Sequence, residues 1–218
     1  MNMEIDVKLK YIKIMKKILI IIFAFCLLLF ELSAQTDKNE VYKKLVSQYG
    51  KINTITVAFD SDNGQIRNGI LKAKKGNKYN ITIGQNKIIS DGKTVWNYNP
   101  IRKNVVITDF IPEMSGLTLD YFFFNILGNL QPIALKTELS TARKKQQILE
   151  LQAKDKNIDI RKVNLFMDEN FSKITEIEII TNSFSQKWRI KNLEINKNIP
   201  DSNFIFKTPE GVEEIDVR

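Results

Sequence analysis

Two stretches of the chain place acidic residues close enough together to suggest metal or acid-base chemistry. Residues 60–64 read Asp-Ser-Asp-Asn-Gly and begin like a calcium-binding loop. Such a loop needs glycine at its sixth position and a bidentate glutamate at its twelfth, but here the glycine comes one position early and the twelfth residue is Leu71. Asp168 and Glu169 are adjacent at a predicted turn between strands, and neighbouring strand side chains point to opposite faces. We therefore interpret both stretches as turns.

The chain lacks the side chains on which most catalytic and metal sites depend. It contains no histidine, and its single cysteine is Cys26. A Ser-His-Asp triad and a histidine-based metal site are therefore impossible, and the sequence has no phosphate-binding loop or dinucleotide fingerprint. A hydrolase would need a pair of carboxylates in a groove, and the sequence does not indicate one. We expect no catalytic residue, no metal and no cofactor. A hydrolase that acts on an envelope polymer is kept only as a third hypothesis, behind two binding functions.

The first 34 residues are typical of an export signal and not of a folded domain. Lys16 and Lys17 precede an uncharged apolar run over residues 18–30, and a small residue, Ala34, follows shortly after it. The run is shorter than the roughly 20 residues that a membrane-spanning helix needs. We expect residues 1–34 to be a signal peptide that is cleaved after Ala34, with Met15 as an alternative start. Residues 35–218 are then expected to form a single exported domain.

Charge and cysteine usage narrow the possible partners. The formal net charge is +8, and the basic residues are scattered along the chain. Scattered lysines are typical of a solvated surface. The alternative, more specific interpretation is that they bind an anionic membrane or an acidic partner. Export argues against nucleic acid as a partner. Cys26 lies inside the apolar run and follows Phe25 instead of a small residue, so we expect no lipid to be attached to it.

One amphipathic helix and a series of short strands must position whatever site the domain has. Residues 37–40 resemble a capping box, apolar residues follow at helical spacing, and Gly50 stands where a helix C-cap belongs. Asp91-Gly92 predicts a tight hairpin turn. An apolar period of two predicts an antiparallel sheet with strands at 53–59, 66–73, 79–84, 87–90, 94–99, 103–108, 147–153, 162–167, 174–180, 186–195 and 203–207.

Residues 117–130 interrupt this pattern with a predicted helix. Tyr121 and Phe124 lie off its main apolar face, so the helix is apolar on more than one side. Such a helix either completes the core of the sheet or covers a cavity for an apolar ligand. Taken alone, the residues favour core filling by about two to one. The main apolar face carries Leu119, Phe122, Phe123, Ile126, Leu127 and Leu130.

Several stretches resemble the LolA family of periplasmic lipoprotein carriers. Residues 91–100, Asp-Gly-Lys-Thr-Val-Trp-Asn-Tyr-Asn-Pro, are similar to the family's D-G-K-T-hydrophobic-W-x-Y-x-P segment. Residues 69–79 resemble its G-x-L-x-x-K-R-P-x-x-F hairpin, and residues 204–212 resemble its F-x-F-x-P-P-x-G-V ending. The amphipathic helix and a first strand that ends in Phe59 agree in order. The resemblance covers residues 36–216 and implies a mainly β (α+β) fold, an unclosed antiparallel β-barrel or half-barrel with a helical lid.

The resemblance implies a function in lipoprotein transport. An apolar cavity would take up the acyl chains of outer-membrane lipoproteins, which an inner-membrane ABC transporter supplies and an outer-membrane acceptor receives. We expect a monomeric periplasmic chaperone that does no covalent chemistry, and the helix at 117–130 becomes its lid. The alternative is a LolA-like module that binds a different lipid or senses envelope stress. By strand parity and helix face, the candidate cavity residues are Val57, Phe59, Ile70, Tyr79, Ile81, Trp96, Tyr98, Phe122, Phe123 and Leu127.

One departure from the family pattern concerns lid closure. Lys75 stands where the family has an arginine that takes part in closing the lid, and Gly76 stands where the family has proline. Lysine keeps the positive charge but lacks the planar guanidinium with its several donors. Glycine lacks the rigidity of proline. We therefore expect the energetics of lid closure to differ here.

Overall fold

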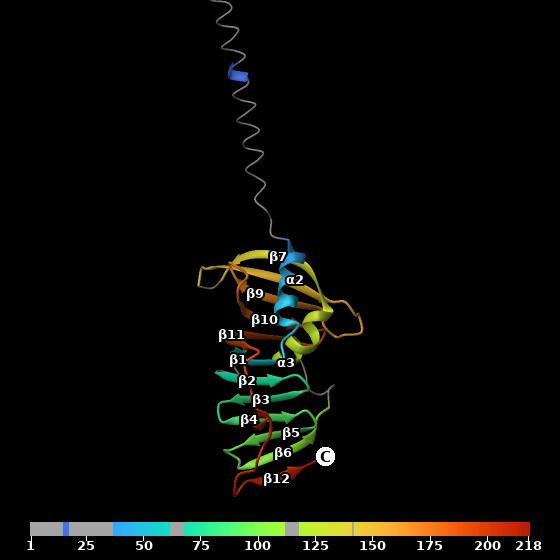
Figure 1. Cartoon of the computed structure of the whole chain (residues 1–218), viewed down its shortest axis with the longest axis vertical. Helices are drawn as coiled ribbons and strands as arrows, with labels where there is room; N and C mark the ends of the chain where they lie inside the picture. The colour runs from blue at the N-terminus through green and yellow to red at the C-terminus, as the bar shows by residue number, and fades with distance from the viewer. Residues whose placement is uncertain (1–14, 18–36, 62–67, 112–117, 141) are drawn as a thin grey trace, which may run out of the picture. The chain divides into compact units, whose positions relative to one another are not determined.

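Twelve strands form one sheet in the order β12-β6-β5-β4-β3-β2-β1-β11-β10-β9-β8-β7 (Figure 1). All neighbouring strands are antiparallel except β12 and β6, which run parallel. β12 and β7 lie at the two ends of this order, so the sheet is not closed into a barrel. The predicted fold class, a mainly β unclosed sheet, is confirmed.

The computed structural model describes residues 15–17, 37–61, 68–111, 118–140 and 142–218. Residues 38–218 group into one compact unit. The predicted signal-peptide run at 18–30, Cys26 within it and the cleavage site after Ala34 lie outside the described residues, as does the end of the 60–64 turn.

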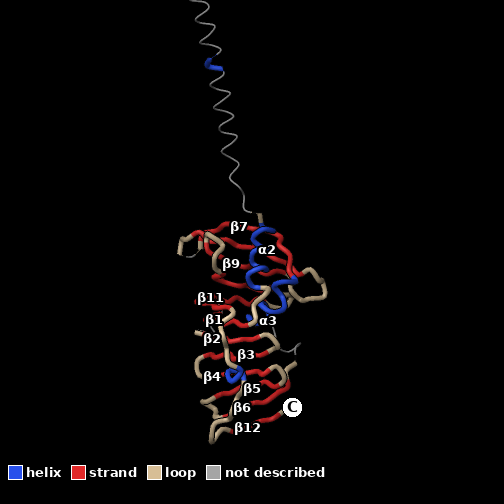
Figure 2. Tube along the Cα trace, in the orientation of Figure 1, coloured by secondary structure: helices blue, strands red, loops and turns tan. Residues whose placement is uncertain are grey.

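Strands make up most of the described chain, and helices are few and short (Figure 2). The helices are α2 (Lys38–Tyr49), α3 (Leu119–Tyr121), the π-helical η2 (Phe122–Ile126), and the 3-10 helices η3 (Leu127–Asn129) and η4 (Asp201–Phe204). The strands are β1 (Thr54–Ser61), β2 (Gly69–Lys74), β3 (Lys78–Ile83), β4 (Asn86–Asp91), β5 (Thr94–Asn99), β6 (Asn104–Asp109), β7 (Leu130–Leu139), β8 (Lys145–Ala153), β9 (Lys162–Asp168), β10 (Ile174–Ile180), β11 (Ser185–Ile195) and β12 (Glu213–Asp216).

The strand register divides the side chains between two faces, because successive residues of a strand point to opposite sides. We call one the helix face, since α2 and the helices of residues 119–129 pack on it. Its rows across β2 to β6 are Leu71-Ile81-Ile88-Asn97-Val106 and Ala73-Tyr79-Ser90-Val95-Thr108. We call the other the tail face, since residues 196–212 cross it. Its rows are Ile70-Thr82-Lys87-Tyr98-Val105 and Lys72-Asn80-Ile89-Trp96-Ile107.

The main core lies on the helix face. The predicted N-terminal helix is confirmed as α2, which buries Val41, Leu45 and Tyr49 against it. Gly50 ends this helix as predicted, and its amide donates to the carbonyl of Val46 at 2.7 Å. A side chain at position 50 would collide with that carbonyl, because a Cβ would lie 2.5 Å from its oxygen.

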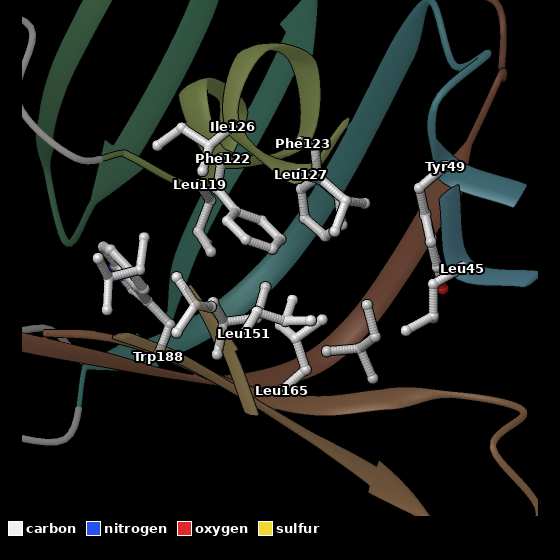
Figure 3. Close-up of a cluster of buried hydrophobic side chains, with 14 of the residues drawn as sticks. Leu45, Tyr49, Leu119, Phe122, Phe123, Ile126, Leu127, Leu151, Leu165 and Trp188 are labelled. Carbon is white, nitrogen blue, oxygen red and sulfur yellow. The ribbon is translucent and has the colours of Figure 1, made fainter. Parts of the chain in front are cut away.

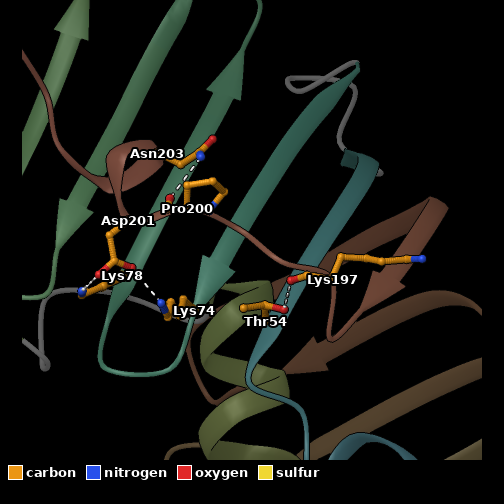
Figure 4. A network of polar contacts seen from close by, with 7 residues as sticks. All are labelled: Thr54, Lys74, Lys78, Lys197, Pro200, Asp201 and Asn203. Carbon is orange, nitrogen blue, oxygen red and sulfur yellow. Dashed lines mark hydrogen bonds and ion pairs between the residues drawn. The ribbon is translucent and has the colours of Figure 1, made fainter.

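A smaller apolar layer lies on the tail face, under residues 196–212. Phe204 is 1% exposed, Ile89 and Ile107 are buried, and the rings of Tyr98 and Phe206 lie 5.2 Å apart. Polar contacts hold this tail in place (Figure 4): Asp201 forms ion pairs with Lys74 and Lys78. In addition, the Asn80 amide donates to the carbonyl of Asn203 at 2.9 Å.

Three sequence predictions about these elements are wrong in detail. Residues 119–129 are not a regular α-helix but a succession of α, π and 3-10 turns, and Leu117 lies outside the described residues. Residues 203–207 are not a strand, because the chain after Pro200 turns through η4 and crosses the sheet. β7 was missed, since Pro132 argues against a strand. Pro132 is tolerated there because β7 is an edge strand with an irregular register next to it.

Candidate functional site

Residues 119–129, here called the lid segment, cover the helix face with apolar side chains. Figure 3 shows Leu119, Phe122 and Leu127 directed from the lid segment toward Leu151, Leu165 and Trp188 of the sheet. All six residues of the predicted apolar helix face are buried, which confirms the assigned face: Leu119, Phe122, Phe123, Ile126, Leu127 and Leu130. Off that face, Tyr121 is exposed and Phe124 is half-buried, also as predicted.

Aromatic contacts link the lid segment to α2. The rings of Phe122 and Phe123 meet edge to face with centroids 5.2 Å apart, and the ring of Phe123 lies 5.5 Å from that of Tyr49. The π-helical turn at residues 122–126 interrupts the regular backbone pattern where these rings enter the core. Single π turns of this kind are frequent at functional sites.

Hydrogen bonds tether the lid segment at its C-terminal end. The hydroxyl of Tyr42 donates to the carbonyls of Leu127 and Leu130, and the ammonium of Lys154 donates to the carbonyl of Gly128 at 3.0 Å. Among the described residues, the side-chain and turn hydrogen bonds of residues 119–124 reach no farther than Thr118, which directly precedes the segment. The N-terminal half is therefore held to the rest of the protein mainly by apolar contact.

An open hollow lies on the helix face where the lid segment leaves the sheet uncovered. It has a volume of about 360 Å³, at the lower end of the roughly 300–1,000 Å³ of ligand sites. Tyr79, Val95, Phe110 and Ile111 contribute most of its apolar lining. The packed core under the lid segment and this hollow share one face of the sheet.

Seven of the ten predicted cavity residues lie together on the helix face. Val57, Phe59, Phe122, Phe123 and Leu127 are buried in its core, and Tyr79 and Ile81 pack against that core half-buried. The ring of Phe59 lies over Gly69, where an added Cβ would come within 2.6 Å of it. The main core under the lid segment is filled by side chains, so the core-filling interpretation describes this closed arrangement.

The other three predicted cavity residues, Ile70, Trp96 and Tyr98, lie on the tail face, apart from the other seven. Trp96 pairs between Ile89 and Ile107, and Tyr98 packs against Phe206. Ile70 is 44% exposed in the same row as Tyr98. Strand parity had grouped these three consistently, but β4 to β6 carry apolar side chains on both faces, such as Ile88 and Ile89 on β4, and parity alone does not say which face is covered by the lid.

Lys75 lies in the turn between β2 and β3, next to the N-terminal half of the lid segment. Its side chain is exposed and lines a second cavity together with Asp120, Tyr121 and Phe124. Gly76 follows with a φ of +93°. Proline is fixed near −65°, so the family's proline would not fit this backbone. The turn therefore has its own geometry, as the departure at residues 75–76 suggested.

A buried polar pair lies beside that second cavity. Burial raises the pKa of the Asp120 carboxyl, although hydrogen bonds from Thr118 and from the backbone of Asp120 and Tyr121 oppose the change. Burial and the nearby Asp120 together raise the pKa of Tyr79 to about 12, against the lowering effect of a hydrogen bond with Ser90. Sequence reasoning missed Asp120, and its place next to the aromatic run was the only signal for it.

The carboxylates singled out in the sequence have structural roles. Burial would raise the pKa of Asp168, but hydrogen bonds from the Ser172 hydroxyl and from the backbone of Lys173 and Ser172 hold it below the ordinary value. Asp60 accepts from the amide of Asn68 and pairs with Lys191 at 2.8 Å. No group of three potential metal ligands occurs within the part of the chain that the structure describes.

A family model described as outer membrane lipoprotein carrier protein LolA matches residues 44–207. The chain belongs to the LolA family. An outer-membrane lipoprotein carrier protein of Pasteurella multocida is 28% identical over 80% of this chain and 86% of its own. One from Haemophilus influenzae is 30% identical over 72% of this chain and 74% of its own.

Among solved structures, a LolA superfamily protein from Nitrosomonas europaea is 12% identical, covers 76% of this chain and 97% of its own, and gives a TM-score of 0.35. Within the residues described here, the model contains no helix that is both long and apolar enough to span a lipid bilayer.

The LolA-like sequence motifs have clear structural places. Asp91 accepts hydrogen bonds from the amides of Lys93 and Thr94, both at 2.8 Å, which confirms the predicted Asp-Gly hairpin turn between β4 and β5. The motif at residues 204–212 packs on the tail face and leads into β12. These two motifs therefore build the tail face and the β4–β5 turn, whereas the third, at residues 69–79, forms the β2–β3 hairpin whose turn lies next to the lid segment.

Proposed function

We propose that the protein is a periplasmic chaperone that binds the acyl chains of outer-membrane lipoproteins between the lid segment and the helix face. The observation that carries this proposal is the lid segment itself. It fills an apolar interior with Phe122, Phe123 and Leu127, and among the described residues its hydrogen bonds to distant parts of the chain are at its C-terminal end. The curated relatives, named as outer-membrane lipoprotein carriers, support the same assignment.

In the proposed mechanism, the N-terminal half of the lid segment moves away from the sheet about its tethered end. Acyl chains then enter beside Tyr79 and Phe110 and replace the lid side chains against Val57 and Phe59. Each buried methylene contributes about 0.8 kcal/mol, so a few chains compensate for the lost lid contacts. Lys75, beside the moving half, takes the place of the family arginine in closing the lid.

Photo-crosslinking from defined positions tests where the acyl chains bind. A photoreactive phenylalanine analogue would replace Phe123 in the lid segment or Phe110 in the hollow, with Phe206 on the tail face as the matched control. The protein is purified from its host, irradiated and analysed by mass spectrometry. We expect lipoprotein adducts from positions 123 and 110 and none from 206. Adducts from 206 alone, or none at all, would contradict the proposal, and a lipid without protein would favour the alternative lipid-binding module.

We further propose that the exported chain, cleaved after Ala34, works as a monomer that takes lipoproteins from an inner-membrane ABC transporter to an outer-membrane acceptor. Incubation of the purified protein with spheroplasts that make a labelled lipoprotein tests the first half of this route. The label is expected to appear in the soluble fraction as a one-to-one complex. Release that is no greater than in buffer alone would refute the shuttle.

A further inference from the structure

A second cavity lies between the β2–β3 turn and the N-terminal half of the lid segment. It has a volume of about 240 Å³, which is room for several heavy atoms, since one water occupies about 30 Å³ of liquid. The lining includes the rings of Phe110, Tyr121 and Phe124, and among the lining residues Asp120 is the only acid and Lys75 the only base. The cavity therefore combines three aromatic rings with the amides of Asn77 and Asn125 and one charged group of each sign.

Asp120 brings an unsatisfied acceptor to this cavity. The residue is only 8% exposed, and its Oδ1 has no hydrogen-bond partner among the described residues. Buried polar atoms are nearly always hydrogen-bonded. Within the described part of the chain, this oxygen is therefore left able to accept a hydrogen bond from a bound molecule. Lys75 does not donate to this oxygen, because no ion pair joins Lys75 to Asp120 in the described structure.

The cavity is next to the larger hollow in which we place the acyl chains. Phe110 lines both spaces, and Asp120 is close enough to Tyr79, which lines the hollow, to affect its ionisation. A molecule with its chains in the hollow can therefore extend its polar end past Phe110 to Asp120. This geometry relates the unsatisfied oxygen to the head of the cargo.

We propose that this cavity binds the polar end of the acylated cargo through an N–H group that donates to Oδ1 of Asp120. An amide of an N-acylated chain end and a free ammonium both supply such a donor, and the aromatic rings suit either. Exposed Lys75 offers a second contact to a carbonyl oxygen of the same head. The inference rests on the proposed function and deepens it by naming the chemistry of the cargo's head.

The test compares three ligands that differ only at the head. Dipalmitoylglycerol has no N–H, a dipalmitoylated lipopeptide has a free ammonium, and the same lipopeptide acetylated at its N-terminus has an acyl amide instead. Their Kd values are measured for the full protein, for Asp120→Asn, and for Glu210→Gln as a control, because Glu210 is an exposed carboxylate that lines neither cavity. We expect Asp120→Asn to weaken binding of the N–H ligands by about tenfold or more and to leave dipalmitoylglycerol unchanged. The lipopeptide that loses more affinity identifies the source of the N–H.

Two results would overturn this inference while leaving the proposed function intact. In one, Asp120→Asn weakens all three ligands equally, which means that Asp120 only supports the lid. In the other, it changes none of them, which means that water satisfies Oδ1. If the unaltered protein binds no acylated ligand at all, the proposed function fails and this inference fails with it. Asn keeps the shape of Asp, and thermal unfolding of the variant checks that it is folded.

Discussion

The two faces of the sheet are covered in different ways. On the tail face, residues 196–212 are fixed by directional contacts: ion pairs from Asp201 to Lys74 and Lys78 and parallel strand pairing of β12 with β6. On the helix face, the lid segment is held by Phe122, Phe123 and their apolar neighbours, and among the described residues its hydrogen bonds to distant parts of the chain lie near its C-terminal end. Apolar contacts are non-directional, so a bound acyl chain can replace them, whereas it cannot replace the polar contacts of the tail. In the proposed function, the tail is therefore a permanent cover of the sheet and the lid segment an exchangeable one.

The largest expected effect compares one phenylalanine from each cover. Phe122 of the lid segment is 0% exposed, and Phe204 of the tail is 1% exposed. Replacing either with alanine should lower the free energy of unfolding by about 3–5 kcal/mol, measured by urea denaturation. Only Phe122→Ala should change the Kd of an acylated ligand. The distinction between the covers fails if Phe204→Ala changes that Kd as much.

A second prediction concerns the hairpin turn that supports the sheet away from the lid. Gly92 has a φ of +98°, and a Cβ there would lie 2.4 Å from the carbonyl oxygen of Gly76. Gly92→Ala should destabilise the protein by about 1–2 kcal/mol for the left-handed backbone, with the collision adding to that. Gly128→Ala is the control, since a Cβ at that position meets nothing within 4 Å. Equal unfolding midpoints for the two variants would show that the turn relaxes freely.

A third prediction uses the pH dependence of Asp120. Its pKa in the folded protein is raised above the ordinary 3.8. While the carboxyl is protonated in both the folded and the unfolded state, it does not lower the free energy of unfolding. This stability is lost as the pH rises through the folded-state pKa. Asp120→Asn should therefore stabilise the protein at neutral pH by about 1–2 kcal/mol and have no effect below pH 3.8. Thermal unfolding across this range measures the difference. Tyr79, whose pKa is raised to about 12, stays protonated over this range.

The tether of the lid segment gives a smaller effect. Tyr42→Phe removes the hydrogen bonds to the carbonyls of Leu127 and Leu130 and should cost about 0.5–1.5 kcal/mol. Amide exchange in residues 119–130 should become faster than in β3 to β6. Tyr98→Phe on the tail face is the matched control and should leave lid exchange unchanged. Equal acceleration in both variants would contradict a local tether.

The smallest effect is expected for the exposed ion pairs of the tail. Lys74 and Lys78 lower the pKa of Asp201 through their hydrogen bonds to it. The contribution of Asp201 to stability is thus present above its ordinary pKa of 3.8 and lost as pH falls through the lowered value. Asp201→Asn should shift the unfolding midpoint less than any variant above, and only above pH 3.8. Added salt should reduce even this shift. A shift that persists at high salt would mean that the pair is more than a surface contact.

Local patterns in the sequence were enough to predict many elements. The capping residues and apolar spacing of residues 37–50 predicted α2, and Asp91-Gly92 predicted the turn between β4 and β5, because both depend on interactions within a few residues. The apolar face of the lid segment was also predicted correctly. β7 and β12 were not predicted, since Pro132 interrupts one, and the other is a short, exposed strand that only pairing with β6 stabilises.

The candidate site was predictable only in part, because it also depends on contacts between segments that are far apart in the sequence. The parity of β5 correctly placed Trp96 and Tyr98 on one face with Val95 on the other, but the strand carries an apolar side chain on each face, so parity alone does not identify the face that meets the lid. Which face meets the lid is decided by the tail, because Phe204 and Phe206 occupy the Trp96 side. The role of Asp120 could not be predicted for a similar reason. Whether its Oδ1 has a hydrogen-bond partner depends on which residues the fold places around it.

By itself, the sequence determined the absence of histidine chemistry, the amphipathic α2, the strand alternation and the resemblance to the LolA family, because all of these are set by residue types and short spacings. Tertiary structure decided which side of each strand is covered, how the lid segment is tethered and where Asp120 is left without a donor. Those features depend on segments that are far apart in the chain. Tyr42 reaches Leu127 and Asn80 reaches Asn203 only after the sheet has brought them together.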